Sequence, residues 1–144
     1  LSNALFIRRN NLYPRLILNS ANAYTTDTMH KVHIKDSINK QAFIASFYNS
    51  LSFAFSEIVG RSYGGGVLEL MPSETQKILL PYHANNESLL TVVDNMMREK
   101  KSIDEILVIT NKYILKNGYG LTDEEIDLAT SIWKKLSKRR LNRT

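Results

Sequence analysis

The chain has 144 residues, of which 43% are hydrophobic and 23% charged, and this is the composition of one ordinary globular domain with a real core. It contains no cysteine, which excludes disulfides and thiolate metal sites, and its three histidines are too few and too scattered to indicate zinc. No apolar run approaches the roughly 20 residues that span a bilayer, and no signal peptide is visible. We therefore expect no membrane partner, and the absence of cysteine fits a reducing cytoplasm.

The start of the chain indicates that it is a piece of a longer protein. It begins with Leu1 rather than methionine, and Ser2-Asn3-Ala4 resembles a cloning remnant. We expect residues 1–4 to be such a remnant and the remainder to be excised from a larger parent.

The net charge of +5 is concentrated at the two ends of the chain. Residues 5–40 carry many more cations than acids, and the tail after Asp127 carries cations only. This distribution favours a polyanion as partner, with nucleic acid first. A solvated surface with a frayed basic tail remains the alternative. The cations are Arg8, Arg9, Arg15, Lys31, Lys35 and Lys40 at one end, and Lys134, Lys135, Lys138, Arg139, Arg140 and Arg143 at the other.

Residues 5–35 have the pattern of short strands separated by loops. LFIRR (5–9), RLILN (15–19) and MHKVHIK (29–35) are the strand candidates. The polar stretch between the last two is rich in Asn and Thr, the residue types that read base edges and hold phosphates. Its alternative interpretation is a polar surface loop. The side chains that can donate and accept hydrogen bonds are Asn19, Thr25, Thr26, Thr28 and His30, and Lys31 adds reach.

A helical period follows, from Lys40 to Ile58. Large apolar residues recur every three or four positions, which predicts one central helix that Gly60 ends. Small polar residues on its other faces allow close packing or polar contacts. The apolar face is Phe43, Phe47, Leu51, Ala54 and Ile58, and the small polar residues are Ser46, Asn49, Ser50, Ser52 and Ser56.

Three consecutive glycines, residues 64–66, lie between this helix and VLELM, which is typical of a short strand. Phosphate-binding glycine loops lie instead between a strand and a helix, and the Walker type also needs a lysine, so neither type fits. Two interpretations remain. The glycines either reverse the chain tightly through positive φ, or let a ligand's backbone come close, with Arg61, Ser62 and Tyr63 as polar contacts.

The rest of the chain is predicted to be helical. An S-x-x-Q spacing from Ser73 predicts a short helix that ends before Pro81, and capping boxes at Ser102 and Thr122 start two later helices. The sequence therefore predicts an α+β fold, in which a small mixed part over residues 5–82 precedes a helical extension with a basic tail over residues 86–144.

No catalytic set of residues is present. The chain has no G-x-S-x-G elbow and no cysteine nucleophile, and Asp123, Glu124 and Glu125 suit the positive end of a helix. An independent enzyme is therefore the weakest interpretation. A protein–protein or dimerisation module that uses the C-terminal helices is the main rival to nucleic-acid binding, with Met96, Met97, Trp133 and Leu141 as its contacts.

Two segments, PRLILNSANAYTTDTMHKVHI (14–34) and FYNSLSFAFSEIVGRSYGGGVLELMPSETQKILLP (47–81), resemble a known family. It is the C-terminal target-recognition region of adenine-specific N6 DNA methyltransferases from bacterial restriction–modification systems. The resemblance implies a cytoplasmic parent that transfers a methyl group from S-adenosylmethionine to a flipped-out adenine. The family's cofactor motif and N-P-P-Y-type motif are missing, so we expect this chain to be inactive and to bind no cofactor.

The resemblance implies two partners, namely double-stranded DNA and the missing catalytic domain. Arginines and lysines would neutralise phosphates, and the Asn, Thr, His and Tyr side chains would contact bases or sugars. The glycine motif could hold the catalytic domain instead. The candidates for DNA contact are Arg8, Arg9, Arg15, Asn19, Thr25, Thr26, His30, Lys31, Arg61, Ser62, Tyr63, Gly64, Gly65 and Gly66.

Overall fold

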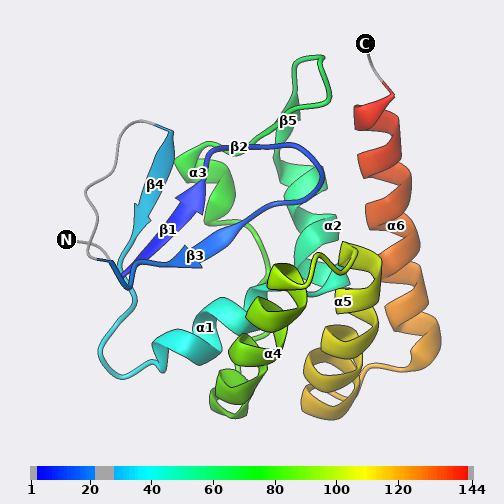
Figure 1. The fold of residues 1–144 in the computed structure, drawn as a ribbon. Coiled ribbons are helices and arrows are strands. Elements are labelled where there is room, and N and C mark those ends of the chain that lie inside the picture. Colours follow the sequence, from blue (N-terminus) through cyan, green and yellow to red (C-terminus); the bar gives the residue numbers. More distant parts are fainter. Residues whose placement is uncertain (1–2, 22–27, 143–144) are drawn as a thin grey trace.

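The computed structural model describes residues 3–21 and 28–142 and has the predicted α+β fold (Figure 1). Two small antiparallel sheets occupy one side of the molecule, and helices pack below and beside them. The C-terminal helix α6 runs along the opposite side, so that its end lies near the loop after β5. No single helix in the described ranges is long and apolar enough to cross a membrane. Two consecutive helices, α1 (Lys40–Phe47) and α2 (Ser50–Val59), would be long and apolar enough together, but they are bent relative to each other.

The first sheet has the order β3-β1-β4 and confirms the three predicted strands, each in shortened form. β1 (Ala4–Ile7) lies between β3 (Leu16–Leu18) and β4 (Met29–Val32), and both pairings are antiparallel. Asn3 and Ala4, which the sequence marks as a remnant, are integral to this sheet. Ala4 is fully buried, and the Asn3 side chain accepts a hydrogen bond from the Ile34 amide at 2.8 Å.

The second sheet has the order β2-β6-β5 and holds the predicted strand after the glycines. It consists of β2 (Arg9–Asn10), β6 (Leu68–Glu69) and β5 (Arg61–Ser62). Only Arg8 separates β1 from β2. The Arg8 amide donates to the Thr28 carbonyl at 3.1 Å and its carbonyl accepts from the Leu70 amide at 2.9 Å, so one residue joins the two sheets.

The prediction of one helix over residues 40–58 is wrong. The segment forms α1 (Lys40–Phe47) and α2 (Ser50–Val59), which are bent by 71°. Asn49 is extended, with φ −154°, and its side chain accepts from the Ser52 amide at 2.8 Å. A residue that caps the second helix in this conformation cannot continue the first, so the apolar face is broken and Ile58 is 60% exposed.

Gly60 ends α2 as predicted, but for a different reason. Its φ of −78° is open to any residue. A Cβ at this position would lie 2.7 Å from Leu68 Cδ1 and 2.8 Å from the Ser56 carbonyl oxygen. Glycine is therefore needed at this position because β6 packs closely against it, and not because the backbone is left-handed.

The predicted helix from Ser73 is shorter and starts earlier. α3 (Pro72–Thr75) has one turn, and its cap is the Glu74 carboxylate, which accepts from the Met71 amide at 2.9 Å. The expected box between Ser73 and Gln76 is therefore wrong. Proline at the first position favours this earlier start, since it needs no amide partner there.

The helical extension matches the prediction closely. A 3₁₀ turn, η1 (Ala84–Asn86), leads into α4 (Glu87–Arg98), and α5 (Ile103–Thr110) continues as the π-helix η2 (Asn111–Gly118) before α6 (Asp123–Leu141). The capping boxes at Ser102 and Thr122 are both formed.

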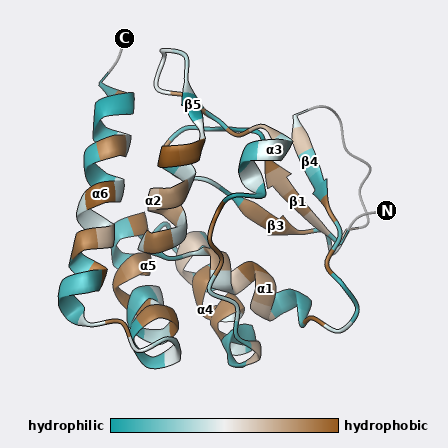
Figure 2. Cartoon of the chain, turned by 180° about the vertical axis from the view of Figure 1, so that it is seen from behind, coloured by the Kyte–Doolittle hydropathy of each residue, from teal (hydrophilic) through white to brown (hydrophobic). Residues whose placement is uncertain are grey.

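One core joins the sheets, α1 and α2 to the later helices. The rings of Phe53 on α2 and Trp133 on α6 lie 5.3 Å apart, and Phe6 of β1 meets Phe47 of α1 at 5.5 Å. Figure 2 shows hydrophobic residues concentrated in β1, β3 and α2, whereas the C-terminal end of α6 is mainly hydrophilic. The predicted apolar faces of the extension are thus buried mostly against the first part of the chain.

Candidate nucleic-acid interface

The three glycines lie at the tip of a hairpin formed by β5, the loop 63–67 and β6, which we call the glycine hairpin. Gly64, Gly65 and Gly66 have φ values of 95°, 65° and 76°, so the interpretation as a tight turn is confirmed. The turn joins the strands β5 and β6, whereas the sequence predicted a turn between a helix and a strand. A Cβ at Gly64 or Gly65 would meet nothing within 4 Å. The tip is therefore open space, which another molecule's backbone could approach.

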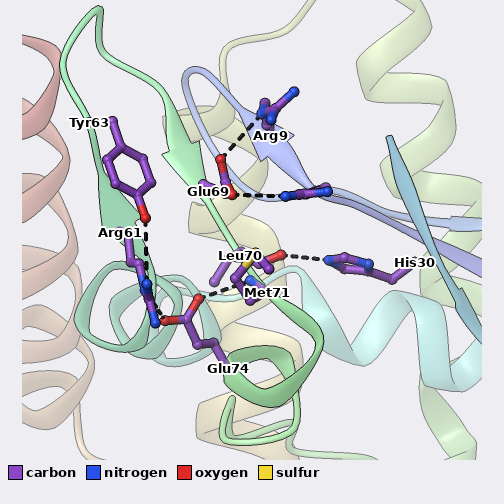
Figure 3. Close-up of polar contacts among 9 residues, drawn as sticks. Arg9, His30, Arg61, Tyr63, Glu69, Leu70, Met71 and Glu74 are labelled. Atoms are coloured by element: carbon purple, nitrogen blue, oxygen red, sulfur yellow. Dashed lines mark hydrogen bonds and ion pairs between the residues drawn. The ribbon is translucent and has the colours of Figure 1, made fainter. Parts of the chain in front are cut away.

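Arg61 is held at the base of this hairpin (Figure 3). Its Nε donates to Glu74 Oε2 at 2.9 Å and its Nη1 to the Tyr63 hydroxyl at 3.5 Å. Hydrogen bonds from Tyr63 and Glu74 raise the pKa of the guanidinium above its usual value. The side chain is nevertheless 58% exposed, so a ligand can reach it.

Glu74 fixes this arginine through a second contact. Its other oxygen accepts from the Met71 amide at 2.9 Å, so the carboxylate is bound on both sides. Burial raises the pKa of Glu74, but the Met71 amide and Arg61 together outweigh that effect, and the pKa lies below its usual value. Glu74 is therefore ionised at neutral pH and orients Arg61.

Glu69 of β6 plays the same part for two arginines. Its oxygens accept from Arg9 Nε and from Arg8 Nη2, each at 3.2 Å (Figure 3). Hydrogen bonding to Arg9, and then to Arg8, lowers the pKa of Glu69 despite partial desolvation. Arg9 is 60% exposed and Arg8 26%. The sequence did not single out either carboxylate, and an acid inside the apolar stretch VLELM was the only signal for Glu69.

His30 connects β4 to the same region. Its Nε2 lies 2.6 Å from the Leu70 carbonyl oxygen, so this nitrogen donates and the ring bridges the two sheets (Figure 3). Lys31 beside it is exposed. A cavity of about 490 Å³ opens next to them, between β4 and the segment after β6. Its lining includes His33, Phe43, Gln76, Ile78 and Leu80.

Of the other residues predicted to contact DNA, those that the structure describes lie away from the arginines and carboxylates beside the hairpin, or are buried. Asn19 is only 8% exposed, and its amide donates to the Asn3 carbonyl at 2.8 Å. The Ser62 hydroxyl is buried without a partner among the residues described. Arg15 is exposed and stacks 5.0 Å above the Tyr13 ring. Thr25 and Thr26 fall within 22–27, outside the described residues.

One contact beside the glycine hairpin, which is made by Arg140, was not anticipated from the sequence. Arg140 near the end of α6, placed by the sequence in a solvated basic tail, is only 3% exposed and paired at 2.8 Å with Glu57, which is equally buried. Its Nη1 donates to the carbonyls of Asn11 and Gly66. The expectation of a solvated tail is therefore wrong for Arg140. No sequence signal pairs it with residues so distant along the chain.

Residues 1–115 match the model of a protein family described as the C-terminal domain of the type II methyltransferase M.Eco57I. The matched range includes both sheets, the glycine hairpin, α4 and α5, and ends before α6 begins. Comparisons with curated proteins and with solved structures gave no match.

Proposed function

The chain belongs to the family of the C-terminal domain of the type II methyltransferase M.Eco57I, and we propose that it is the DNA-recognition domain of an adenine-specific DNA methyltransferase. The parent would methylate adenine N6 in a specific sequence of double-stranded DNA, with S-adenosylmethionine as donor, in a bacterial restriction–modification system of the cytoplasm. The cofactor and the flipped adenine would be held by the catalytic domain, which is the second partner of this chain.

The observation that supports this function best is the set of exposed, pre-oriented guanidinium groups around the open glycine hairpin. Arg9 and Arg61 each donate from Nε to a carboxylate, at 3.2 and 2.9 Å, and their side chains stay 60% and 58% exposed. A guanidinium held in this way loses less side-chain entropy when it binds a phosphate or a guanine edge. A tight turn and surface ion pairs are enough to explain the fold of this region, but they do not require the arginines to remain exposed.

The local charge limits how strongly this surface can attract DNA. Arg8, Arg9 and Arg61 are opposed by Glu69 and Glu74, so the cluster retains only a small positive charge. Lys31 adds to it from β4. We therefore expect weak, salt-sensitive binding by the chain alone, with the catalytic domain supplying further contacts in the parent.

The C-terminal helices favour the rival function less. Trp133, expected to contact a partner, is 4% exposed and packs on Phe53. Leu141 lies against the glycine hairpin, where its Cδ2 is 3.4 Å from the position of a Cβ at Gly66. Both side chains are therefore engaged within the chain.

Duplex binding by the Arg61→Ala variant tests the proposal. Fluorescence anisotropy across a salt series should show weaker binding, and a lost phosphate contact should reduce the slope of log K against log salt by about one. Loss of a base contact should instead cost about 1–3 kcal/mol at one base position. Arg98→Ala is the matched control, because Arg98 pairs with Asp94 at 2.8 Å on α4 and lies beside β3. Equal losses in both variants, or none, would contradict a DNA role for Arg61.

Adenine specificity is tested on the full-length parent. Mapping methylated adenine in genomic DNA from cells that express it should give one short fixed motif. Modified cytosine, or adenine methylated without a motif, would contradict the proposed specificity.

A further inference from the structure

The last turn of α6 contacts the glycine hairpin through the side chain of Arg140. Arg140 uses Nε and Nη2 to bind both oxygens of Glu57 on α2, at 2.8 to 3.2 Å. Its Nη1 donates to the Gly66 carbonyl at the hairpin and to the Asn11 carbonyl after β2, the latter at 2.5 Å. A single guanidinium thus holds three segments that are all far from Arg140 in sequence.

This arrangement satisfies a strict electrostatic requirement. The side chains of Arg140 and Glu57 are each 3% exposed, and a buried charge is costly unless it is paired and its remaining donors are bonded. The planar fork of arginine can face a carboxylate with one edge and carbonyls with another, whereas a lysine ammonium is a compact charge that lacks this geometry. The site therefore requires arginine both for its charge and for its shape.

Pairing of β6 with β2 and β5 fixes the strands of the glycine hairpin, but its tip has few other constraints. Gly64 and Gly65 are in open space, and Tyr63 is 68% exposed. Among the contacts of the described residues, those of Gly66 with Arg140 and Leu141 attach the loop to the helical body. Figure 1 shows the end of α6 beside this loop, and Figure 2 shows the same from behind. The position of the tip relative to the helical body thus depends on these contacts with α6.

We propose that Arg140 is a positioning residue for DNA recognition, which holds the tip of the glycine hairpin in place without touching DNA. The proposal rests on the function proposed above. α6 begins after the range that matches the family model, so this chain supplies the support from a helix outside that range. The basic end of α6 would then contribute to DNA recognition through the buried Arg140, and not only through the charge of its exposed cations.

The test compares Arg140→Lys with Arg139→Lys in the 144-residue chain. Arg139 is an exposed arginine on the same helical turn, so its variant is the matched control. Hydrogen exchange of the amides of residues 61–68 should become about tenfold faster in Arg140→Lys, since a charge-assisted bond to the hairpin is lost. Duplex affinity should fall by about tenfold with an unchanged salt slope, because no phosphate contact is removed. Arg139→Lys should change neither quantity.

The outcomes separate the inference from the proposed function. A wild-type chain that binds no duplex at any salt concentration overturns both. A wild-type chain that binds, with Arg140→Lys binding equally well or showing unchanged hairpin exchange, overturns only the positioning role. If Arg140→Lys unfolds, Leu141→Ala decides, because it loosens the same loop without disturbing the buried charge. Faster hairpin exchange and weaker binding in Leu141→Ala support the inference, and wild-type values overturn it.

Discussion

Replacement of Asn49 by alanine tests why α1 and α2 are separate helices. The side chain is fully buried and makes several hydrogen bonds. Its oxygen accepts from the Ser52 amide at 2.8 Å, and its nitrogen donates to the Ser46 carbonyl at 2.7 Å and to the Ser52 hydroxyl at 2.9 Å. Alanine removes all of these bonds.

The expected loss follows from these contacts. Loss of the helix cap costs about 1 kcal/mol of unfolding free energy. Leaving buried backbone groups such as the Ser46 carbonyl unpaired costs about 1–3 kcal/mol more. We expect a total of about 2–4 kcal/mol, a large part of the roughly 5–15 kcal/mol that stabilises a typical domain. Urea denaturation followed by circular dichroism measures it, and the midpoint should fall by about 1 M or more.

Asn39→Ala is the matched control for this measurement. Asn39 caps α1 in the same way, with its side chain accepting from the Ala42 amide at 2.9 Å, but it is only half-buried. It should cost about 1 kcal/mol. If Asn49→Ala costs no more than Asn39→Ala, burial of the Asn49 amide does not matter and the stated cause of the break between the helices is refuted.

Three further predictions concern the glycines, the carboxylate beside Arg61 and the core. In urea denaturation, Gly65→Ala should cost about 1–2 kcal/mol of unfolding free energy, because alanine is strained at a φ of +65°. Gly60→Ala should cost more, because the new Cβ would lie 2.8 Å from the Ser56 carbonyl oxygen, and equal costs for the two variants would contradict this. Folding lowers the pKa of Glu74, so its ionised form stabilises the fold above the unfolded pKa of about 4.3, and this stabilisation is lost as pH falls through the folded pKa. Glu74→Gln should therefore reduce the fall of Tm with pH in this acid range. A fall of Tm equal to that of the wild type would contradict this prediction. Trp133→Ala should cost about 3–5 kcal/mol in thermal unfolding, and a loss below about 1 kcal/mol would contradict its place in the core.

Local patterns predicted most of the fold. The strands of the first sheet, the capping boxes at Ser102 and Thr122 and the strand after the glycines were all expected, because each depends on neighbours within a few residues. The single helix over residues 40–58 was not correct, since the same apolar spacing suits two helices and one asparagine side chain decided between them. Helical periodicity reports which face is apolar, and it does not report where the axis bends.

The sequence singled out the cations of the candidate site but not its anions. Arg9 and Arg61 are exposed beside the hairpin, and Glu69 and Glu74 that hold them were not anticipated, because ion pairs across strands depend on register. Asn19 was expected in contact with DNA and is buried in the structure. Composition identifies residue types that suit a ligand, whereas burial decides which of them a ligand can reach.

The sequence by itself determined the fold class, most of the secondary structure and the positive φ turn of the glycine run, because these are set by local sterics and hydrogen bonds. Only the tertiary structure decided the role of Arg140. In the sequence it is one cation in a basic tail, yet the packing of α6 on α2 places it between Glu57 and the Gly66 carbonyl. A charge on a helix end is favourable in water, and burial converts it into a requirement for partners that only the assembled fold can supply.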